Sequence, residues 1–209
     1  MFMALTRTPT AAQALEILLT GNRRFVDGDP QHPNQGTAHR ASLAPAQHPF
    51  AVLFGCSDSR LAAEIIFDRG LGDLFVVRTA GHVLGPEVLG SIEYGVDQLG
   101  CPLVVVLGHD ACGAIRAARS ILEDGLTPAG YVRDVVERVT SSVLAARAAG
   151  LSEEPDIVDE HVRHTVDMLL DRSPALARGR TAVVGLSYHL DDGRVRLVAS
   201  HGLDDAEAA

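Results

Sequence analysis

The sequence predicts an α/β protein with a central, mostly parallel four-stranded sheet, flanked by helices, and an added antiparallel strand at its C-terminal edge. Three observations support this prediction. Short apolar runs rich in β-branched residues alternate with helical patterns, which is typical of a parallel sheet covered on both faces. The 209 residues, of which 46% are hydrophobic, are enough to bury a core without disulfides. The dipeptide Asp192-Gly193 is a hairpin signal, so the strand after it is expected to run antiparallel.

Before the first expected strand, the sequence predicts one amphipathic helix and a loop. Thr10 can cap a helix whose apolar side chains recur on one face, and Gly21 is expected to end it. Residues 28–49 are rich in proline, histidine and glutamine, which favours a loop with one short helix. We therefore expect an N-terminal helical arm over about residues 10–45, within a single domain that spans 1–209.

From residue 50 onward, strands and helices are expected to alternate. Apolar runs without polar interruption predict strands, whereas apolar residues three or four positions apart predict helices. Pro86 is expected in the first turn of one helix, and Gly100 is expected to stop it. In chain order we expect a strand at 50–55, a helix at 61–68, a strand at 74–78, a helix at 86–100, a strand at 103–107, a helix at 111–123, long helices around 132–143 and 158–169, and strands at 181–187 and 195–199.

The charge balance argues against several classes of partner. Acidic residues number 27 and basic residues 18, which gives a formal net charge of −9. Such a chain repels phosphate backbones and lacks a basic face for an anionic membrane, so neither nucleic acid nor membrane is an expected partner. No apolar run approaches the ~20 residues of a membrane-spanning helix, and no basic segment precedes the N-terminal apolar residues as in a signal peptide. A cytoplasmic protein is therefore expected.

Two short segments carry most of the chemistry, and each follows an expected central strand. The first is CSDSR at 56–60, and the second is GHDACGA at 108–114. Ligands bind beyond the carboxyl ends of the strands in open α/β sheets, so the two segments meet in one crevice if their strands are neighbours. The chain has three cysteines, and this odd number favours metal ligation or catalysis over disulfides.

Cys56, His109 and Cys112 are the candidate metal ligands. Taken singly, a cysteine after a strand is more often a small buried apolar residue, and a histidine near a helix start more often a hydrogen-bonding one. Together, two thiolates and an imidazole form a set that selects zinc over magnesium or calcium. Three protein ligands leave a fourth tetrahedral position open, which marks a catalytic zinc. Cys101 lacks such company and is expected to be structural.

The two segments resemble those of the β-class carbonic anhydrases. The resemblance extends over most of the chain, and it is strongest to bacterial, actinobacterial-like members that carry R-T-A-G-H, here at 78–82. The other shared motifs are G-N-x-R-F at 21–25, A-E at 63–64, F-V-V-R at 75–78, I-E-Y at 92–94 and D-D-G at 191–193.

The resemblance implies one zinc ion per chain, held by Cys56, His109 and Cys112. It implies the reversible hydration of carbon dioxide to bicarbonate and a proton, by attack of zinc-bound hydroxide on carbon dioxide. Asp58 is an implied catalytic residue that orients the attacking oxygen, and in the family's resting state it is itself a zinc ligand. Arg60 is the second implied catalytic residue, because it can hold Asp58 in a bidentate, charge-assisted pair.

The resemblance also implies a substrate pocket that is completed across a dimer interface. The matching positions are Gln47, whose amide can donate to bicarbonate, and Phe75 and Tyr94, which would form an apolar wall. Ala80 stands where the family usually has valine or isoleucine, so a looser wall is expected. The backbone N–H of Gly113, at a helix start, could face an anion.

Homodimers, often paired into homotetramers, are implied as well, with the N-terminal helix gripping the neighbour. Some family members also bind bicarbonate at a second, inhibitory site that uses tryptophan, arginine and tyrosine. Arg78 and Tyr188 match two of these positions, but Leu53 stands where the tryptophan would be, and the chain contains no tryptophan. We therefore expect this inhibitory site to be incomplete.

Other interpretations stay open at this point. Some relatives use the same zinc site to hydrolyse carbon disulfide or carbonyl sulfide. A non-catalytic, zinc-stabilised structural protein is another alternative, although zinc binding alone does not require Asp58 and Arg60. A redox-sensing cysteine pair is a further one. Away from these segments, His161 and His164, near Asp167, are expected to line a polar helical face.

Overall fold

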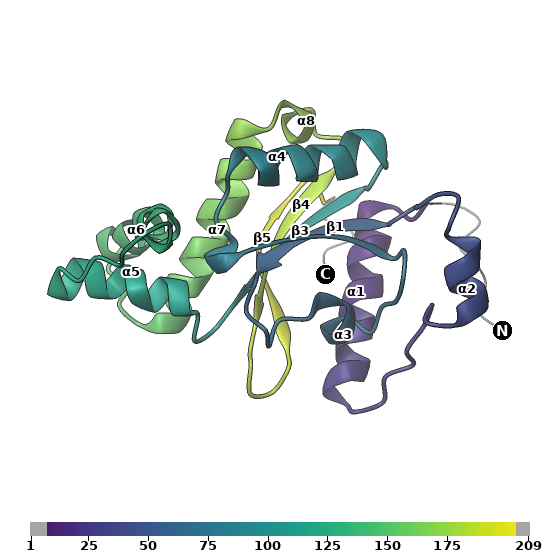
Figure 1. The fold of residues 1–209 in the computed structure, drawn as a ribbon, viewed down its shortest axis with the longest axis horizontal. Coiled ribbons are helices and arrows are strands. Elements are labelled where there is room, and N and C mark those ends of the chain that lie inside the picture. The colour runs from purple at the N-terminus through teal and green to yellow at the C-terminus, as the bar shows by residue number, and fades with distance from the viewer. Residues whose placement is uncertain (1–7, 204–209) are drawn as a thin grey trace.

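The computed structural model describes residues 8–203, so both ends of the expected 1–209 domain lie outside it. At its centre is one five-stranded sheet in the order β2-β1-β3-β4-β5 (Figure 1). Strands β1 to β4 pair in parallel, and β5 pairs antiparallel with β4 at the edge. This confirms the predicted fold of four parallel strands with an antiparallel C-terminal edge strand. The strands are β1 (Ala51–Cys56), β2 (Leu74–Thr79), β3 (Leu103–His109), β4 (Ala182–Tyr188) and β5 (Val195–His201).

Helices connect the strands and cover both faces of the sheet. They are α1 (Ala11–Val26), α2 (Thr37–Ser42), α3 (Ala63–Ile66), α4 (Pro86–Glu93), α5 (Gly113–Asp124), α6 (Val132–Ala148), α7 (Glu154–Arg172) and α8 (Pro174–Ala177), with a 3-10 turn η1 (Ala80–His82) and a π-helical turn η2 (Tyr94–Gln98). Helices α4, α7 and α8 lie on one side of the sheet, and α1 and α3 on the other (Figure 1). Among the described residues, no helix is long and apolar enough to cross a membrane.

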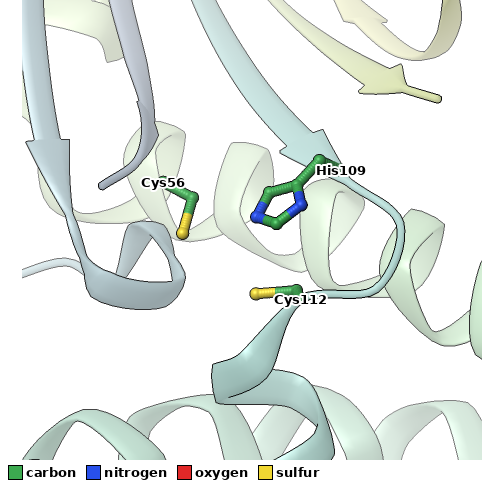
Figure 2. A group of neighbouring side chains, drawn as sticks. All are labelled: Cys56, His109 and Cys112. Carbon is green, nitrogen blue, oxygen red and sulfur yellow. The ribbon is translucent and has the colours of Figure 1, made fainter. Parts of the chain in front are cut away.

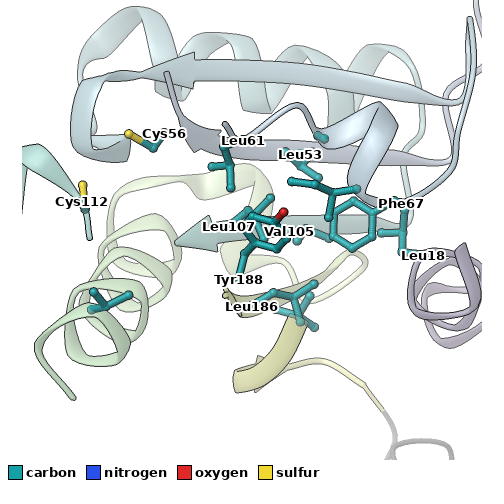
Figure 3. Packing of buried hydrophobic residues seen from close by; sticks show 14 of the residues in the cluster. Leu18, Leu53, Cys56, Leu61, Phe67, Val105, Leu107, Cys112, Leu186 and Tyr188 are labelled. Carbon is teal, nitrogen blue, oxygen red and sulfur yellow. The ribbon is translucent and has the colours of Figure 1, made fainter. Parts of the chain in front are cut away.

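Side chains along each central strand alternate between two apolar cores, as the two-residue period of a strand requires. Val52 and Phe54 of β1 pack into the core under α4, α7 and α8. Leu53 of β1 faces the other core, which it shares with Leu18 of α1 and with Phe67 (Figure 3). Cys56 and Cys112 lie at the edge of this second core, so the candidate ligands are buried where the sheet ends.

Helix α1 begins as predicted but continues past its predicted end. The hydroxyl of Thr10 accepts from the backbone N–H of Gln13 at 3.2 Å, and the Gln13 side chain accepts from the Thr10 N–H at 3.0 Å, which forms a capping box. The prediction that Gly21 ends this helix is wrong. An ideal Cβ on Gly21 would lie only 1.8 Å from the backbone oxygen of Phe67, so this glycine permits close packing instead.

Two other predicted helices are shorter than expected. The helix expected at 61–68 covers four residues, because the chain turns at Asp68, whose φ is 46°. The helix expected at 86–100 is α-helical only to Glu93 and continues as the wider turn η2. In η2 the backbone of Gly95 lies against β1, since an ideal Cβ there would be 2.4 Å from Val52 Cγ2.

The N-terminal segment divides into a packed part and an exposed part. Helix α1 buries Ala14, Leu15 and Leu18 against its own chain. Asn22 ties this helix to the hairpin between β4 and β5: its amide donates to the Gly193 carbonyl at 2.8 Å and accepts from the Val195 N–H at 3.1 Å. Helix α2, in contrast, has no buried residue.

Candidate metal centre

The candidate ligands meet where neighbouring parallel strands end. Cys56 is the last residue of β1, and His109 is the last residue of β3, which pairs with β1. After β3 the chain makes a tight turn in which Ala111 adopts a φ of 50°. Cys112 follows as the N-cap of α5, which accounts for the H-x-x-C spacing. The predicted convergence of the two segments at one sheet edge is thus observed in the fold.

The three side chains point toward one another (Figure 2). Their Sγ, ring-nitrogen and Sγ atoms all lie within 4.8 Å of each other. All three residues are buried, with exposed fractions of 5% for Cys56 and 1% each for His109 and Cys112. Such a group of two thiols and an imidazole can close around one ion, and its donor atoms are those that zinc prefers.

The orientation of His109 shows that the group fits a metal. Its Nδ1–H donates to the backbone carbonyl of Asp110 at 2.7 Å, which fixes the ring and leaves Nε2 with a lone pair. Nε2 is buried and has no hydrogen-bond partner among the described residues. Buried polar atoms are nearly always paired, so this unpaired nitrogen beside two sulfurs fits a metal cation as its partner.

Without an ion, the two thiols compete for one proton. The pKa of Cys56 is lowered, chiefly because the Cys112 thiol donates a hydrogen bond to its sulfur, while burial acts in the opposite direction. The pKa of Cys112 is raised, because its hydrogen bond to Cys56 and its burial both favour the protonated form. One sulfur is therefore ready to bind a cation as a thiolate, and the second must lose its proton when the ion binds.

Asp58 and Arg60 form the expected bidentate pair beside this group. Arg60 Nε donates to Asp58 Oδ1 at 2.9 Å, and Arg60 Nη2 donates to Oδ2 at 2.7 Å. The Arg60 hydrogen bond holds the pKa of Asp58 well below its usual value, so the carboxylate is ionised at neutral pH. Its Oδ2 lies 4.0 Å from Nε2 of His109, so Asp58 borders the three ligand atoms without belonging to their cluster.

Arg78 contributes to the site in a way that sequence reasoning missed. From the edge strand β2, its Nε donates to the Cys56 carbonyl at 2.9 Å and its Nη2 donates to the Asp58 carbonyl at 2.6 Å. Arg78 therefore holds the backbone that carries both residues. Tyr188, its expected partner in an inhibitory site, pairs with His109 in the register of β3 and β4 and is buried.

A series of buried hydrogen bonds links the sulfur of Cys56 to helices α7 and α6. The Gly81 N–H donates to Cys56 Sγ at 3.3 Å, and the Gly81 carbonyl accepts from His161 Nε2 at 2.8 Å. The other nitrogen of His161 lies 2.8 Å from Ser142 Oγ and accepts from this hydroxyl. Burial lowers the pKa of His161 to about 4, so the ring is neutral. The expectation that His161 lines a polar helical face is wrong: the face of α7 that carries it packs against η1 and α6.

We expect Ser142→Ala to weaken zinc binding by roughly tenfold, within the range typical for outer hydrogen-bond partners of metal ligands. The substitution leaves Nδ1 of His161 unpaired and weakens the hydrogen bond from His161 Nε2 to the Gly81 carbonyl. The measurement is competition for zinc with a chromophoric chelator. Ser141→Ala is the matched control, because Ser141 is exposed and bonds to the neighbouring Arg138 carbonyl. Equal affinities for both variants would contradict the prediction.

The expected substrate-pocket residues fall into two groups. Ala80 directly follows β2 and precedes Gly81, whose N–H donates to Cys56 Sγ, and Gly113 directly follows Cys112, so both are near the candidate ligands in the chain. Phe75 pairs with Val52, four residues before Cys56, or ~13 Å along the strand. Its ring lies 6.0 Å from that of Tyr94, which is 48% exposed. Gln47 is exposed as well. The chain does not bring the Phe75–Tyr94 pair to its own metal centre.

A mostly parallel α/β sheet with two buried thiols and an imidazole at its carboxyl edge is the class of structure that can hold a zinc ion through three side chains. Comparison with known proteins gives its family. Residues 51–195 match the family model described as carbonic anhydrase. The chain is 58% identical to carbonic anhydrase 2 of Mycobacterium tuberculosis, over 88% of this chain and 91% of that protein. The chain belongs to the carbonic anhydrase family, in its β class.

Solved structures agree with this assignment. The β-carbonic anhydrase of Coccomyxa, solved in complex with acetazolamide, matches with a TM-score of 0.69 and 26% identity, covering 90% of this chain and 88% of that one. A tetrameric β-carbonic anhydrase of Sordaria macrospora has the same fold, with a TM-score of 0.68 at 23% identity, covering 90% of this chain and 99% of that one. These relatives are named carbonic anhydrases, so neither the carbon disulfide or carbonyl sulfide hydrolase nor the non-catalytic alternative is favoured.

Proposed function

We propose that Cys56, His109 and Cys112 hold one zinc ion, with which this carbonic anhydrase hydrates carbon dioxide reversibly to bicarbonate and a proton. The unpaired, buried Nε2 of His109 between two thiols carries this proposal. Zinc bound there lowers the pKa of water from 15.7 toward roughly 7, which makes a nucleophile available near neutral pH. The chain's own contribution is to hold the ligands, to orient the attacking oxygen and to bind carbon dioxide beside it.

Asp58 is the proposed orienting group. As a carboxylate it can only accept hydrogen bonds, so it takes the hydrogen of the attacking oxygen and leaves the lone pair of that oxygen free. Arg60 keeps both carboxylate oxygens in place through its two N–H donors. Arg78 holds the backbone carbonyls on either side of Ser57 and so fixes the position from which Asp58 reaches the site.

The substrate pocket is proposed to be shared between two copies of the chain. Phe75 and Tyr94 lie away from the chain's own metal centre, on and beside the edge strand β2. A partner chain packed against this edge would receive their rings as an apolar wall, together with the amide of Gln47. Ala80 and the N–H of Gly113 complete the pocket from the chain that holds the zinc. We therefore propose that the protein forms homodimers, which pair into homotetramers.

We also propose a single domain in a cytoplasmic enzyme. Strands from both halves of the sequence form one sheet, and α1 packs on the same core. All three cysteines lie among the described residues as free thiols, which is typical of a reducing compartment. The exposed α2 and the segment around it are the part of the arm at 10–45 that remains free to contact a neighbour.

Stopped-flow measurement of carbon dioxide hydration, combined with metal analysis, tests the proposed function. We expect one zinc per chain, loss of activity on chelation and recovery on addition of zinc. A zinc-loaded protein without hydration activity would refute the proposal. Assays with carbon disulfide and carbonyl sulfide on the same sample test the alternative hydrolase directly.

We expect the hydration rate to rise from pH 6 to pH 9. Two thiolates offset the formal 2+ charge of the ion, whereas a three-histidine site leaves this charge intact, so the metal is a weaker Lewis acid here. Asp58 does not cause the rise, because its lowered pKa keeps it ionised across this whole range. The measurement is the rate of carbon dioxide hydration in buffers of constant ionic strength. A rate independent of pH from 6 to 9 would contradict the prediction.

A further inference from the structure

A small cavity lies between η1, α6 and α7. Its volume is about 110 Å³, and its lining includes His82 of η1, Arg138 and Ser141 of α6, and His161 and Arg172 of α7. We refer to it as the α6–α7 cavity. It is separate from the metal centre, because none of the three metal ligands lines it.

His82 brings unused hydrogen-bonding capacity to the α6–α7 cavity. It is 1% exposed, and neither of its ring nitrogens has a partner among the described residues. The neighbouring ring of His161, 4.1 Å away between centroids, has both nitrogens paired. A neutral imidazole offers one N–H and one lone pair, so His82 can donate to a ligand that enters from the cavity. Two unpaired nitrogens on one buried ring call for such a partner.

The charge of the α6–α7 cavity is positive. Arg138 and Arg172 both line it, and no aspartate or glutamate does. Neither arginine forms an ion pair with a carboxylate within the described part of the chain; Arg138 donates to the backbone carbonyl of Leu84 at 2.8 Å. In a chain with a net charge of −9, two guanidinium groups without acidic partners around one cavity form a local site for an anion.

We propose that the α6–α7 cavity binds one small inorganic oxyanion, which Arg138 and Arg172 hold by charge and His82 by its N–H. The volume suits an anion of four or five heavy atoms and excludes an organic cofactor. The class of ligand includes bicarbonate, the enzyme's product, as well as free phosphate and sulfate. The site differs from the expected inhibitory site at Arg78 and Tyr188, because Arg78 is bonded to backbone carbonyls at the sheet edge.

The site also lies close to the hydrogen bonds that support the metal centre. His82 directly follows Gly81, whose N–H donates to Cys56 Sγ, and His161 contacts both the cavity and the Gly81 carbonyl. Gly81 and His82 both have positive φ values, of 62° and 38°. This conformation is unfavourable for a histidine, so the surrounding contacts must stabilise it. An anion at His82 therefore binds one residue away from the group that donates to Cys56.

Selenate is the probe for this site, because selenium gives an anomalous X-ray signal. Crystals of the zinc enzyme soaked in selenate are expected to show a selenium peak between Arg138, Arg172 and His82. In solution, titration calorimetry of the same enzyme is expected to show selenate binding that weakens about tenfold or more in Arg172→Gln, since a charged hydrogen bond is lost. Arg172 is exposed and without an acidic partner among the described residues, so its substitution is compatible with folding.

Arg40→Gln is the matched control, because it removes the same charge from the exposed helix α2 on the other side of the molecule (Figure 1). Any selenate binding that both Arg172→Gln and Arg40→Gln retain is assigned to the metal centre. Arg138→Gln provides a second test of the same cavity.

Displacement of selenate by bicarbonate would assign the site to the product, and displacement by phosphate alone would assign it to free phosphate. A cavity that holds only water, or equal selenate affinity in Arg172→Gln and Arg40→Gln, would overturn the proposal. The readout needs no catalytic activity, so it does not depend on the proposed function.

Discussion

Replacing Cys56 with serine is expected to remove zinc from the protein and to lower the rate of carbon dioxide hydration more than 100-fold. Loss of an outer hydrogen-bond partner already costs about 10–100-fold in metal affinity or activity, and loss of a ligand exceeds this. A serine hydroxyl stays protonated at neutral pH and is a poor ligand for zinc in place of a thiolate. The measurements are zinc content per chain and stopped-flow hydration rates for wild type and Cys56→Ser.

Cys101→Ser is the matched control for this experiment. Cys101 is buried, and its thiol donates to the Pro49 carbonyl at 3.4 Å. Burial raises the pKa of Cys101 to about 12, so it remains a thiol, and it lies outside the cluster of ligand atoms. This variant should keep its zinc and its activity. If Cys56→Ser retained one zinc per chain and full turnover, the assignment of the metal centre to Cys56, His109 and Cys112 would be wrong.

Replacing Arg60 with alanine is expected to reduce turnover by roughly 10–100-fold while zinc stays bound. The variant loses both side-chain N–H donors that hold the Asp58 carboxylate. Asp58 then has no cation beside it other than the metal, so we expect it to become the fourth ligand and to block the open position. X-ray absorption at the zinc edge would detect the added oxygen ligand, and stopped-flow rates would measure the loss.

Arg60→Lys separates charge from geometry at this position. Lysine keeps the positive charge but lacks the planar fork that makes two parallel hydrogen bonds to a carboxylate. We expect a turnover between those of wild type and Arg60→Ala. If turnover and zinc coordination were both unchanged in Arg60→Ala, the Asp58–Arg60 pair would be a structural ion pair without a catalytic role.

Several features of this protein followed from local sequence patterns. Short apolar runs predicted the four parallel strands, and the hairpin signal at Asp192-Gly193 predicted the edge strand β5, which is only partly buried. The capping box at Thr10 could be found from the spacing of Thr10 and Gln13. The segments at 56–60 and 108–114 were recognisable as candidate sites because each joins several chemically active residues within a few positions after a strand.

Other features depended on contacts between residues far apart in the sequence. Nothing near Gly21 indicates that the Phe67 carbonyl will occupy the place of its Cβ. Likewise, the spacing of His161 with its valine neighbours suggested a polar face, whereas Ser142 and Gly81 pair with both nitrogens of the buried ring. The role of Arg78 could not be predicted for the same reason, because its acceptors, the Cys56 and Asp58 carbonyls, lie about twenty residues earlier in the chain.

By itself, the sequence determined which residues can bind zinc, and it determined that they lie at or just after the ends of buried apolar runs. Tertiary structure alone decided which nitrogen of His109 faces the sulfurs, which backbone groups hold Cys56 and Asp58, and which arginines are left without a carboxylate. The physical reason is range. Burial and periodicity act on residues close in the chain, whereas hydrogen bonds and ion pairs act between atoms a few ångströms apart in space, wherever the chain places them.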